Sequence, residues 1–307
     1  MQIRTDLAME SNVRPGMAGI GHHACAFGRI KKTEVTVETE GASRLLHKPC
    51  GRYITFTFDE LYYADAGERT MLSRLIAQTL QTLLPKDGEI LVVGLGNRRI
   101  TADALGSKVL DHLLITRHLG QREKGGAFCS LRSVCALAPG VLGVTGMETA
   151  EVIRGIVQHV KPKAIIAIDA LAARESSRIC TTVQLTDTGI LPGSGVGNHR
   201  MGLSRETLGV PVIAIGVPMV VYATVIARDA LSLMMQDMGI NEEEHEKAMD
   251  SLIEKTMQHA LGDMVVTPRE VDEMVGKVAQ IIADGINEAV QSGLSHEELM
   301  CLSHDSL

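Results

Sequence analysis

The chain has 307 residues and 45% hydrophobic content, enough to bury the core of one large or two modest globular domains. Its formal net charge of −7 would repel polyanions, and with no Trp, 4 Phe and 4 Tyr it offers few stacking platforms for bases. We therefore expect no direct nucleic-acid binding. The hydrophobic share comes from Ala, Val, Ile, Leu and Met, which is typical of parallel sheets covered by helices.

Two features bear on the cellular compartment. The six cysteines are scattered without a Cys-x-x-Cys pair, which indicates reduced thiols rather than a zinc or redox centre, and the first ten residues lack the apolar core of a secretory signal. We therefore expect a cytoplasmic protein. The uncharged stretch 207–227 could span a bilayer by length alone. Pro211, Gly216 and Pro218 interrupt it, so we expect a buried strand, a turn and a buried helix there, and no membrane span.

In chain order, residues 1 to about 50 show no sustained periodicity and predict an irregular segment with one strand near 33–39. Downstream, apolar or alternating runs are interleaved with helical patterns, which indicates βαβ units. The expected strands are 52–58, 90–93, 133–138, 164–169, 178–186 and 210–217. The expected helices are 71–84, 102–112, one starting near Thr145 with Glu148 in its capping box, and everything beyond Ala223.

These patterns predict an α/β fold, with a mostly parallel twisted sheet that carries helices on both faces. Because no linker or repeat divides the chain, we expect a single domain over residues 7–307. Within it, residues 230–307 are expected to form a helical C-terminal extension.

Two aspartates lie where such sheets gather catalytic groups, at the carboxyl ends of strands. Asp169 concludes the apolar run 164–168, and Asp103 lies in the first helical turn after the strand 90–93. A charge at the end of a buried strand is costly unless paired, which favours a function for Asp169, whereas Asp103 could equally stabilise a helix dipole. If their strands are neighbours, the carboxyls could share a proton and act on water and on the leaving amine.

Two glycine-rich loops could approach a ligand closely. The loop 94–97 lacks both the third glycine of a dinucleotide fingerprint and the Lys-Ser/Thr end of a phosphate loop. The loop 193–198 is not clearly a strand-to-helix turn, so we expect flexibility or close passage of a substrate there. The candidates for contact with substrate are Asn97, Gly193, Ser194, Gly195 and Gly197.

Other catalytic patterns in the sequence are weaker than this pair of aspartates. The tripeptide Asp187-Thr-Gly189 occurs in pepsin-like proteases, but those need two copies, and one copy after a strand indicates an Asp-Gly turn. No Gly-x-Ser-x-Gly elbow follows a strand. Asp103 and Asp169 with His199 could form an oxygen-and-nitrogen metal site, although the sequence has no His-Glu-x-x-His motif.

Four stretches of the sequence, taken together in their order and spacing, form a specific combination. They are Arg4-Thr-Asp-Leu-Ala-Met-Glu10, Gly94-Leu-Gly-Asn97 with Thr101-Ala-Asp-Ala-Leu-Gly106, Ala167-Ile-Asp-Ala-Leu-Ala-Ala-Arg174, and Asp187-Thr-Gly-Ile-Leu-Pro-Gly-Ser-Gly-Val-Gly-Asn198. Together they resemble the germination proteases of spore-forming bacteria, endopeptidases that degrade small acid-soluble spore proteins. The resemblance covers nearly the whole chain.

The resemblance implies a fold related to hydrogenase-maturation proteases, a homotetramer in the forespore or spore core, and a catalytic pair that matches Asp103 and Asp169 without a metal or other cofactor. It also implies a zymogen that cleaves itself between Asp6 and Leu7, so that residues 1–6 are the propeptide. That acidic-then-aliphatic bond is similar to the family's substrate preference. The alternatives are a metal-assisted hydrolase using the same carboxylates, a hydrogenase-maturation-type protease, and a non-enzymatic protein whose glycine-rich loop captures a peptide or nickel.

Overall fold

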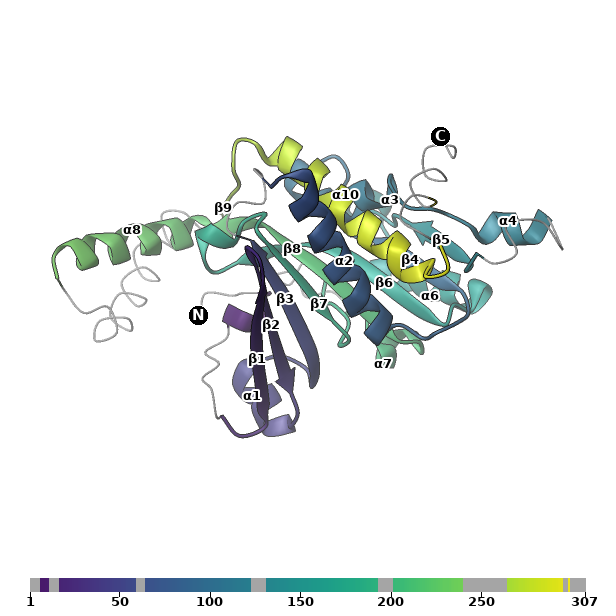
Figure 1. Cartoon of the computed structure of the whole chain (residues 1–307), viewed down its shortest axis with the longest axis horizontal. Coiled ribbons are helices and arrows are strands. Elements are labelled where there is room, and N and C mark those ends of the chain that lie inside the picture. The colour runs from purple at the N-terminus through teal and green to yellow at the C-terminus, as the bar shows by residue number, and fades with distance from the viewer. Residues whose placement is uncertain are drawn as a thin grey trace.

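The computed structural model describes residues 6–10, 17–58, 64–122, 131–192, 201–239, 264–294 and 298. Nine strands form one sheet: β1 (Ile20–Phe27), β2 (Ile30–Val37), β3 (Gly51–Phe58), β4 (Ile90–Gly94), β5 (Val134–Leu137), β6 (Ala164–Ala173), β7 (Thr182–Thr186), β8 (Val212–Tyr222) and β9 (Val265–Val266). Their order is β1-β2-β3-β7-β8-β6-β4-β5, with β9 paired to β8 (Figure 1). The helices are α1 (Glu40–Leu46), α2 (Ala66–Leu83), α3 (Leu105–Leu110), α4 (Arg117–Arg122), α5 (Leu142–Thr145), α6 (Thr149–Val160), α7 (Arg205–Leu208), α8 (Ala223–Asp237) and α10 (Val271–Val290), with 3-10 turns η1 (Ala8–Glu10), η3 (Thr101–Asp103) and η4 (Ser176–Arg178).

The α/β class is confirmed, and the sheet divides into two halves. The strands β5, β4, β6 and β8 run parallel, whereas β1, β2, β3 and β7 are antiparallel to their neighbours, so the sheet is mixed where we expected a mostly parallel one. The antiparallel half begins with the hairpin β1–β2, in which β2 is the strand expected near 33–39 and β1 lies in the part expected to be irregular. The signal of β1 is weak because it lies at the sheet edge and no residue of it is fully buried, which leaves no apolar alternation.

Helices cover both faces of the parallel half, as expected. On one face α2, α3 and α10 pack over the main core, and on the other α6 and α7 enclose a smaller core with residues of β4 and β6. The helix predicted to start near Thr145 is present as α6 but starts at Thr149, and Thr145 is instead the last residue of a separate short helix, α5. Gly146, with φ of +71°, ends α5, and Glu148 and Glu151 form the capping box that starts α6 at Thr149.

The C-terminal helix belongs to the core. The helix predicted after Pro268 is present as α10, and it runs beside α2 across one face of the sheet (Figure 1). Its residues Val275, Ala279, Ile282 and Ile286 are buried in the main core, so this part of the expected extension is integral to the fold rather than appended to it. In contrast, α8 projects from the body of the molecule (Figure 1). Residues 240–263 lie outside the described residues.

The predicted turn at Gly216 and Pro218 is instead the middle of an eleven-residue strand, β8. A proline inside a central strand removes a backbone donor, and a β-bulge follows it directly: Leu171 of β6 pairs with Pro218 and Ala172 pairs with Val220, so Met219 is the extra residue. The helix that follows, α8, begins at Ala223 as expected. Within the described ranges, no helix is both long enough and apolar enough to cross a membrane.

Candidate active site

Asp169 lies within β6 rather than at its end, because both β6 and its neighbour β8 continue past it. It is paired with Gly216 of β8, and Gly216 is paired in turn with Gln184 of β7. Paired residues on neighbouring strands point to the same face of a sheet. Asp169 and Gln184 therefore share the face that α6 and α7 cover elsewhere, with only a glycine between them. Both side chains belong to buried residues, at 4% and 5% exposure.

Asp103 is held by the loop that follows β4. The backbone N–H of Asn97 donates to Asp103 Oδ2 at 2.8 Å, and the N–H of Asp103 donates to the carbonyl of Ile100 at 2.8 Å. Gly96 makes the close approach possible. Its φ is +94°, and a Cβ there would collide with the Asp103 carbonyl oxygen and lie 2.8 Å from Asp103 Oδ1. Thus Asn97, a predicted substrate-contact residue, orients Asp103 through its backbone.

The sheet brings the segments of the two predicted aspartates together. Strands β4 and β6 are parallel neighbours, and Gly94 at the end of β4 lies opposite Ile168. The N–H of Leu95 donates to the Ile168 carbonyl at 2.8 Å, and η3, which contains Asp103, lies against β6 and β8. The expected convergence of these segments at the carboxyl end of β4 is therefore present.

Beyond the end of β4, the side of β6 that β4 no longer covers presents backbone N–H groups from alternate residues, and carboxylates accept hydrogen bonds from them. The N–H groups of Ala170, Ala172 and Arg174 donate to the side chains of Asp169 (3.0 Å), Asp6 (3.0 Å) and Glu10 (2.9 Å), respectively. Residues two apart in a strand present their N–H groups to the same side. The N-terminal segment 6–10 thus extends the row of acceptors that begins with Asp169.

The predicted cleavage bond, Asp6–Leu7, lies against this part of the sheet. The N–H of Asp6 donates to the Ala172 carbonyl at 3.3 Å, and Leu7 is fully buried. The Leu7 side chain packs in a small apolar cluster with Leu171, Ala173, Val221 and Val225. Leu171 and Ala173 have the same parity along β6 as Asp169, so Leu7 lies on the face of the sheet that carries Asp169.

The carbonyl oxygen of Asp6 accepts two hydrogen bonds from side chains. Lys48 Nζ donates at 2.9 Å and Gln184 Nε2 at 3.3 Å, while Gln184 Oε1 accepts from the N–H of Ala8 at 2.7 Å. Burial lowers the pKa of Lys48 below its usual value, and the carboxylates of Asp6 and Glu10 act in the opposite direction by favouring the cation.

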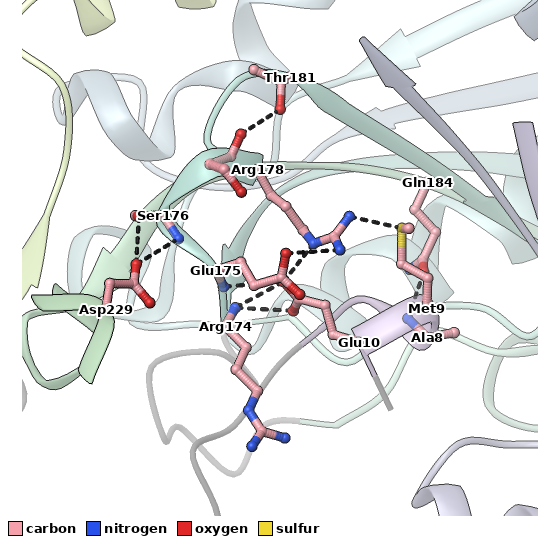
Figure 2. A network of polar contacts seen from close by, with 11 residues as sticks. Ala8, Met9, Glu10, Arg174, Glu175, Ser176, Arg178, Thr181, Gln184 and Asp229 are labelled. Atoms are coloured by element: carbon pink, nitrogen blue, oxygen red, sulfur yellow. Dashed lines mark hydrogen bonds and ion pairs between the residues drawn. The ribbon is translucent and has the colours of Figure 1, made fainter. Parts of the chain in front are cut away.

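Glu10 anchors the end of the segment (Figure 2). Its carboxylate, only 1% exposed, accepts from the N–H groups of Arg174 and Glu175 and forms an ion pair with Arg178 Nε at 3.1 Å. Arg178 also pairs with the half-exposed Glu175 at 2.9 Å and donates to Met9 Sδ at 3.3 Å. The turn after β6 and the N-terminal segment are thereby tied together.

The comparisons with known proteins agree with the motif-based resemblance. A family model described as germination protease matches residues 5–262. Germination proteases of Clostridium perfringens strain 13 and Bacillus velezensis are 40% and 37% identical to the chain, over 97% and 98% of its length and 98% and 97% of theirs. The germination protease of Caldanaerobacter subterraneus is 40% identical over 98% of both chains. The chain belongs to the germination protease family. It is therefore a protease of spore germination.

One solved structure is also similar, a NiFe hydrogenase maturation protease from Thermococcus kodakarensis KOD1. It matches with a TM-score of 0.35 and 16% identity, and the match covers 68% of this chain and 98% of that one.

The remaining predicted residues of this germination protease divide into two groups. Gly193, Ser194, Gly195, Gly197 and the metal-ligand candidate His199 lie outside the described residues. In the part of the chain that the structure describes, no three His, Cys, Asp or Glu side chains gather as a metal site would require. Asp187 is exposed after β7 and accepts from the N–H of Arg52 at 2.8 Å, which supports the interpretation of Asp187-Thr-Gly189 as a turn.

Sequence reasoning missed three residues that the fold of this family member brings to the segment 6–10. Gln184 carries a detectable signal, because it is a polar residue between apolar neighbours in a strand. Glu10 is an acidic residue that directly follows three apolar residues, 7–9. Lys48 has no local sequence signal, since it lies in the loop after α1 and belongs to no motif. Only the tertiary structure places it near Asp6.

Proposed function

We propose that this chain is a self-processing aspartic-type endopeptidase that initiates degradation of small acid-soluble spore proteins in the germinating spore. Family membership supports a spore-protein substrate. The observation that carries the self-processing proposal is the position of the Asp6–Leu7 bond. Asp6 is hydrogen-bonded to Ala172, three residues along β6 from Asp169, and Leu7 is buried on the face that carries Asp169.

In this proposal the pair Asp103 and Asp169 hydrolyses the peptide bond with water. The ionised carboxylate takes a proton from water, whose oxygen adds to the carbonyl carbon, and the protonated carboxylate gives its proton to the leaving nitrogen as the C–N bond breaks. Residues 1–6 are the propeptide of a zymogen. The apolar cluster around Leu7 supports a preference for a large apolar residue after the cut.

The test uses the full chain and follows both its N-terminus and a purified small acid-soluble spore protein by mass spectrometry. Asp103→Asn and Asp169→Asn are expected to slow self-cleavage and substrate cleavage at least about 100-fold, because each removes a proton-transfer group. Asp187→Asn is the matched control, since Asp187 is an exposed turn aspartate, and it should retain wild-type rates. Wild-type activity in either dyad variant would end the proposal.

Chelation separates this mechanism from the metal-assisted alternative. Activity that survives exhaustive chelation supports the dyad, whereas activity that disappears and returns with an added divalent metal would assign the same carboxylates to metal binding. The homotetramer implied by the family resemblance is part of the same proposal, and sedimentation velocity of the full chain tests it.

A further inference from the structure

The carbonyl of Asp6 is the carbonyl of the proposed scissile bond, and two side-chain donors already meet its oxygen. Lys48 Nζ lies 2.9 Å away and Gln184 Nε2 lies 3.3 Å away. Hydrolysis turns this oxygen into an oxyanion, because the electron pair of the C=O bond moves to oxygen as water adds to the carbon. The two aspartates account for the protons but leave this developing charge without a partner.

Both donors are held in place before any reaction. Gln184 lies in the interior of the sheet, where β7 pairs with β3 on one side and with β8 on the other. Its Oε1 accepts from the N–H of Ala8 at 2.7 Å, and because a backbone N–H can only donate, the NH2 group of Gln184 must point to the Asp6 carbonyl. Lys48 follows α1, and its own N–H donates to the carbonyl of Ser43 at 3.2 Å.

The location also fits the dyad. Gln184 and Asp169 lie in one cross-strand row with Gly216 between them, which places their Cα atoms about 10 Å apart, two strand spacings. Asp6 is hydrogen-bonded to both regions, through Gln184 and through Ala172 of β6. A carbonyl that rests on Gln184 therefore lies over the same patch of sheet as Asp169.

We propose that Lys48 and Gln184 form the oxyanion site of this protease, for its own Asp6–Leu7 bond and for the peptide bond of its substrates. Lys48 supplies a cation and Gln184 a neutral donor, and neither transfers a proton. Preorganised donors of this kind stabilise the transition state more than the ground state, because the charge on oxygen grows along the reaction. The inference rests on the proposed function, since it takes Asp6–Leu7 as the bond that is cut.

A purely structural role would use the same contacts to dock the N-terminal segment. The two roles separate in trans, where the fully processed chain cleaves a synthetic peptide of residues 1–12. Lys48→Met should lower kcat about 100- to 1,000-fold with KM within about threefold, as removal of an oxyanion donor does. Gln184→Met should lower kcat about tenfold, because a neutral donor is weaker. Lys31→Met, at an exposed lysine on β2, is the matched control and should behave as wild type.

The alkaline limb of the kcat profile gives a second, independent measurement. The cation at position 48 faces the carboxylates of Asp6 and Glu10, and burial lowers its pKa, so activity should fall with rising pH as Lys48 loses its proton. Lys48→Arg keeps its charge to higher pH and should move this limb upward while retaining part of the activity.

The outcomes are distinct. Wild-type kcat in trans for Lys48→Met, even with slowed self-cleavage, would reduce the contact to docking and overturn the inference. If Lys48→Met fails to fold, as circular dichroism would reveal, an unchanged alkaline limb in Lys48→Arg overturns it instead. A wild-type chain that cuts neither itself nor the peptide between Asp6 and Leu7 would overturn the proposed function as well, whereas a failure confined to the Lys48 variants leaves that function standing.

Discussion

Asp169 of β6 and Gln184 of β7 lie in one cross-strand row of the sheet, with only Gly216 of β8 between them. A Cβ on Gly216 would lie 2.7 Å from Leu171 Cγ, so the glycine lets the Leu171 side chain lean across the row. Leu171 in turn packs against Leu7. The sheet therefore links the buried aspartate, the amide that holds the Asp6 carbonyl and the apolar cluster under Leu7.

Replacing Gly96 should damage activity through Asp103. In Gly96→Ala the new methyl meets the Asp103 carbonyl, and the backbone φ of +94° is strained for alanine, so we expect turnover to fall at least about tenfold and the free energy of unfolding to fall by about 1–3 kcal/mol. Peptide cleavage and urea unfolding measure the two effects. Gly155→Ala is the control, because this exposed glycine of α6 has open space around it and alanine should stabilise the chain by about 0.5–1 kcal/mol at unchanged turnover. Full turnover in Gly96→Ala would show that the loop does not position Asp103.

The two acidic partners of Arg178 should differ in their contribution to stability. Glu10 is almost fully buried, and Glu10→Gln leaves the Arg178 guanidinium, whose side chain is 16% exposed, without its buried partner. We expect the free energy of unfolding to fall by about 3 kcal/mol in urea titrations. Glu175→Gln removes a partner whose side chain is 51% exposed and should cost at most about 1 kcal/mol. Equal losses for the two variants would contradict the assignment of Glu10 as the anchor.

Asn287 should be a stabilising residue of α10. Its Oδ1 accepts from the N–H of Leu114 at 2.9 Å and its Nδ2 donates to the carbonyl of His112 at 3.1 Å. Asn287→Leu leaves these backbone groups without that partner and should lower the free energy of unfolding by about 1–3 kcal/mol. Gln280→Ala, on the same helix, breaks only a local contact with Asp284 and should change stability by no more than about 0.5 kcal/mol. A neutral Asn287→Leu would show that these two hydrogen bonds do not contribute to the stability of the fold.

Stability should decline at alkaline pH because of buried thiols. Burial raises the pKa of Cys180 to about 12 from a usual value of 9.0, so the folded chain keeps the proton that the unfolded chain releases. This contribution is fully present below pH 9.0 and is lost as the pH rises toward 12, with a slope of about 1.4 kcal/mol per pH unit. Urea unfolding at several pH values above 9 should give a shallower decline in Cys180→Ala than in wild type. Cys50→Ala, at an exposed cysteine, should keep the wild-type slope, and identical slopes in all three chains would refute the prediction.

Regular periodicity made much of the fold predictable. The apolar runs of β4 and β6 are buried on both faces, and the helical pattern of α2 follows from burial of one side of the helix, so each of these elements leaves its pattern in adjacent residues. The strand predicted near 33–39 is present as β2, whereas β1 escaped prediction because solvent exposure erases that pattern at an edge. The strand β8 was cut short in prediction because a proline usually ends a strand, whereas here a bulge at Met219, directly after Pro218, lets β8 continue to Tyr222.

The candidate site shows the same limit. The burial of Asp169 follows from its place in an apolar run, and the four motifs indicate the family from the sequence alone. The hydrogen bond from the N–H of Asn97 to the Asp103 carboxylate, in contrast, depends on the path of the loop after β4, which no sequence periodicity predicts.

Sequence by itself determined the α/β class, the family and the choice of Asp169 as a candidate catalytic residue. These conclusions depend on residues that are neighbours along the chain or on motifs in a fixed order. Only the tertiary structure decided what surrounds the Asp6 carbonyl. Lys48 lies 42 residues from Asp6 in sequence and Gln184 lies 178 residues away, and the two donate to the same oxygen from the loop after α1 and from a central strand, β7. Contacts over such separations arise from the pairing order of the strands, a property of the whole sheet that no single segment carries.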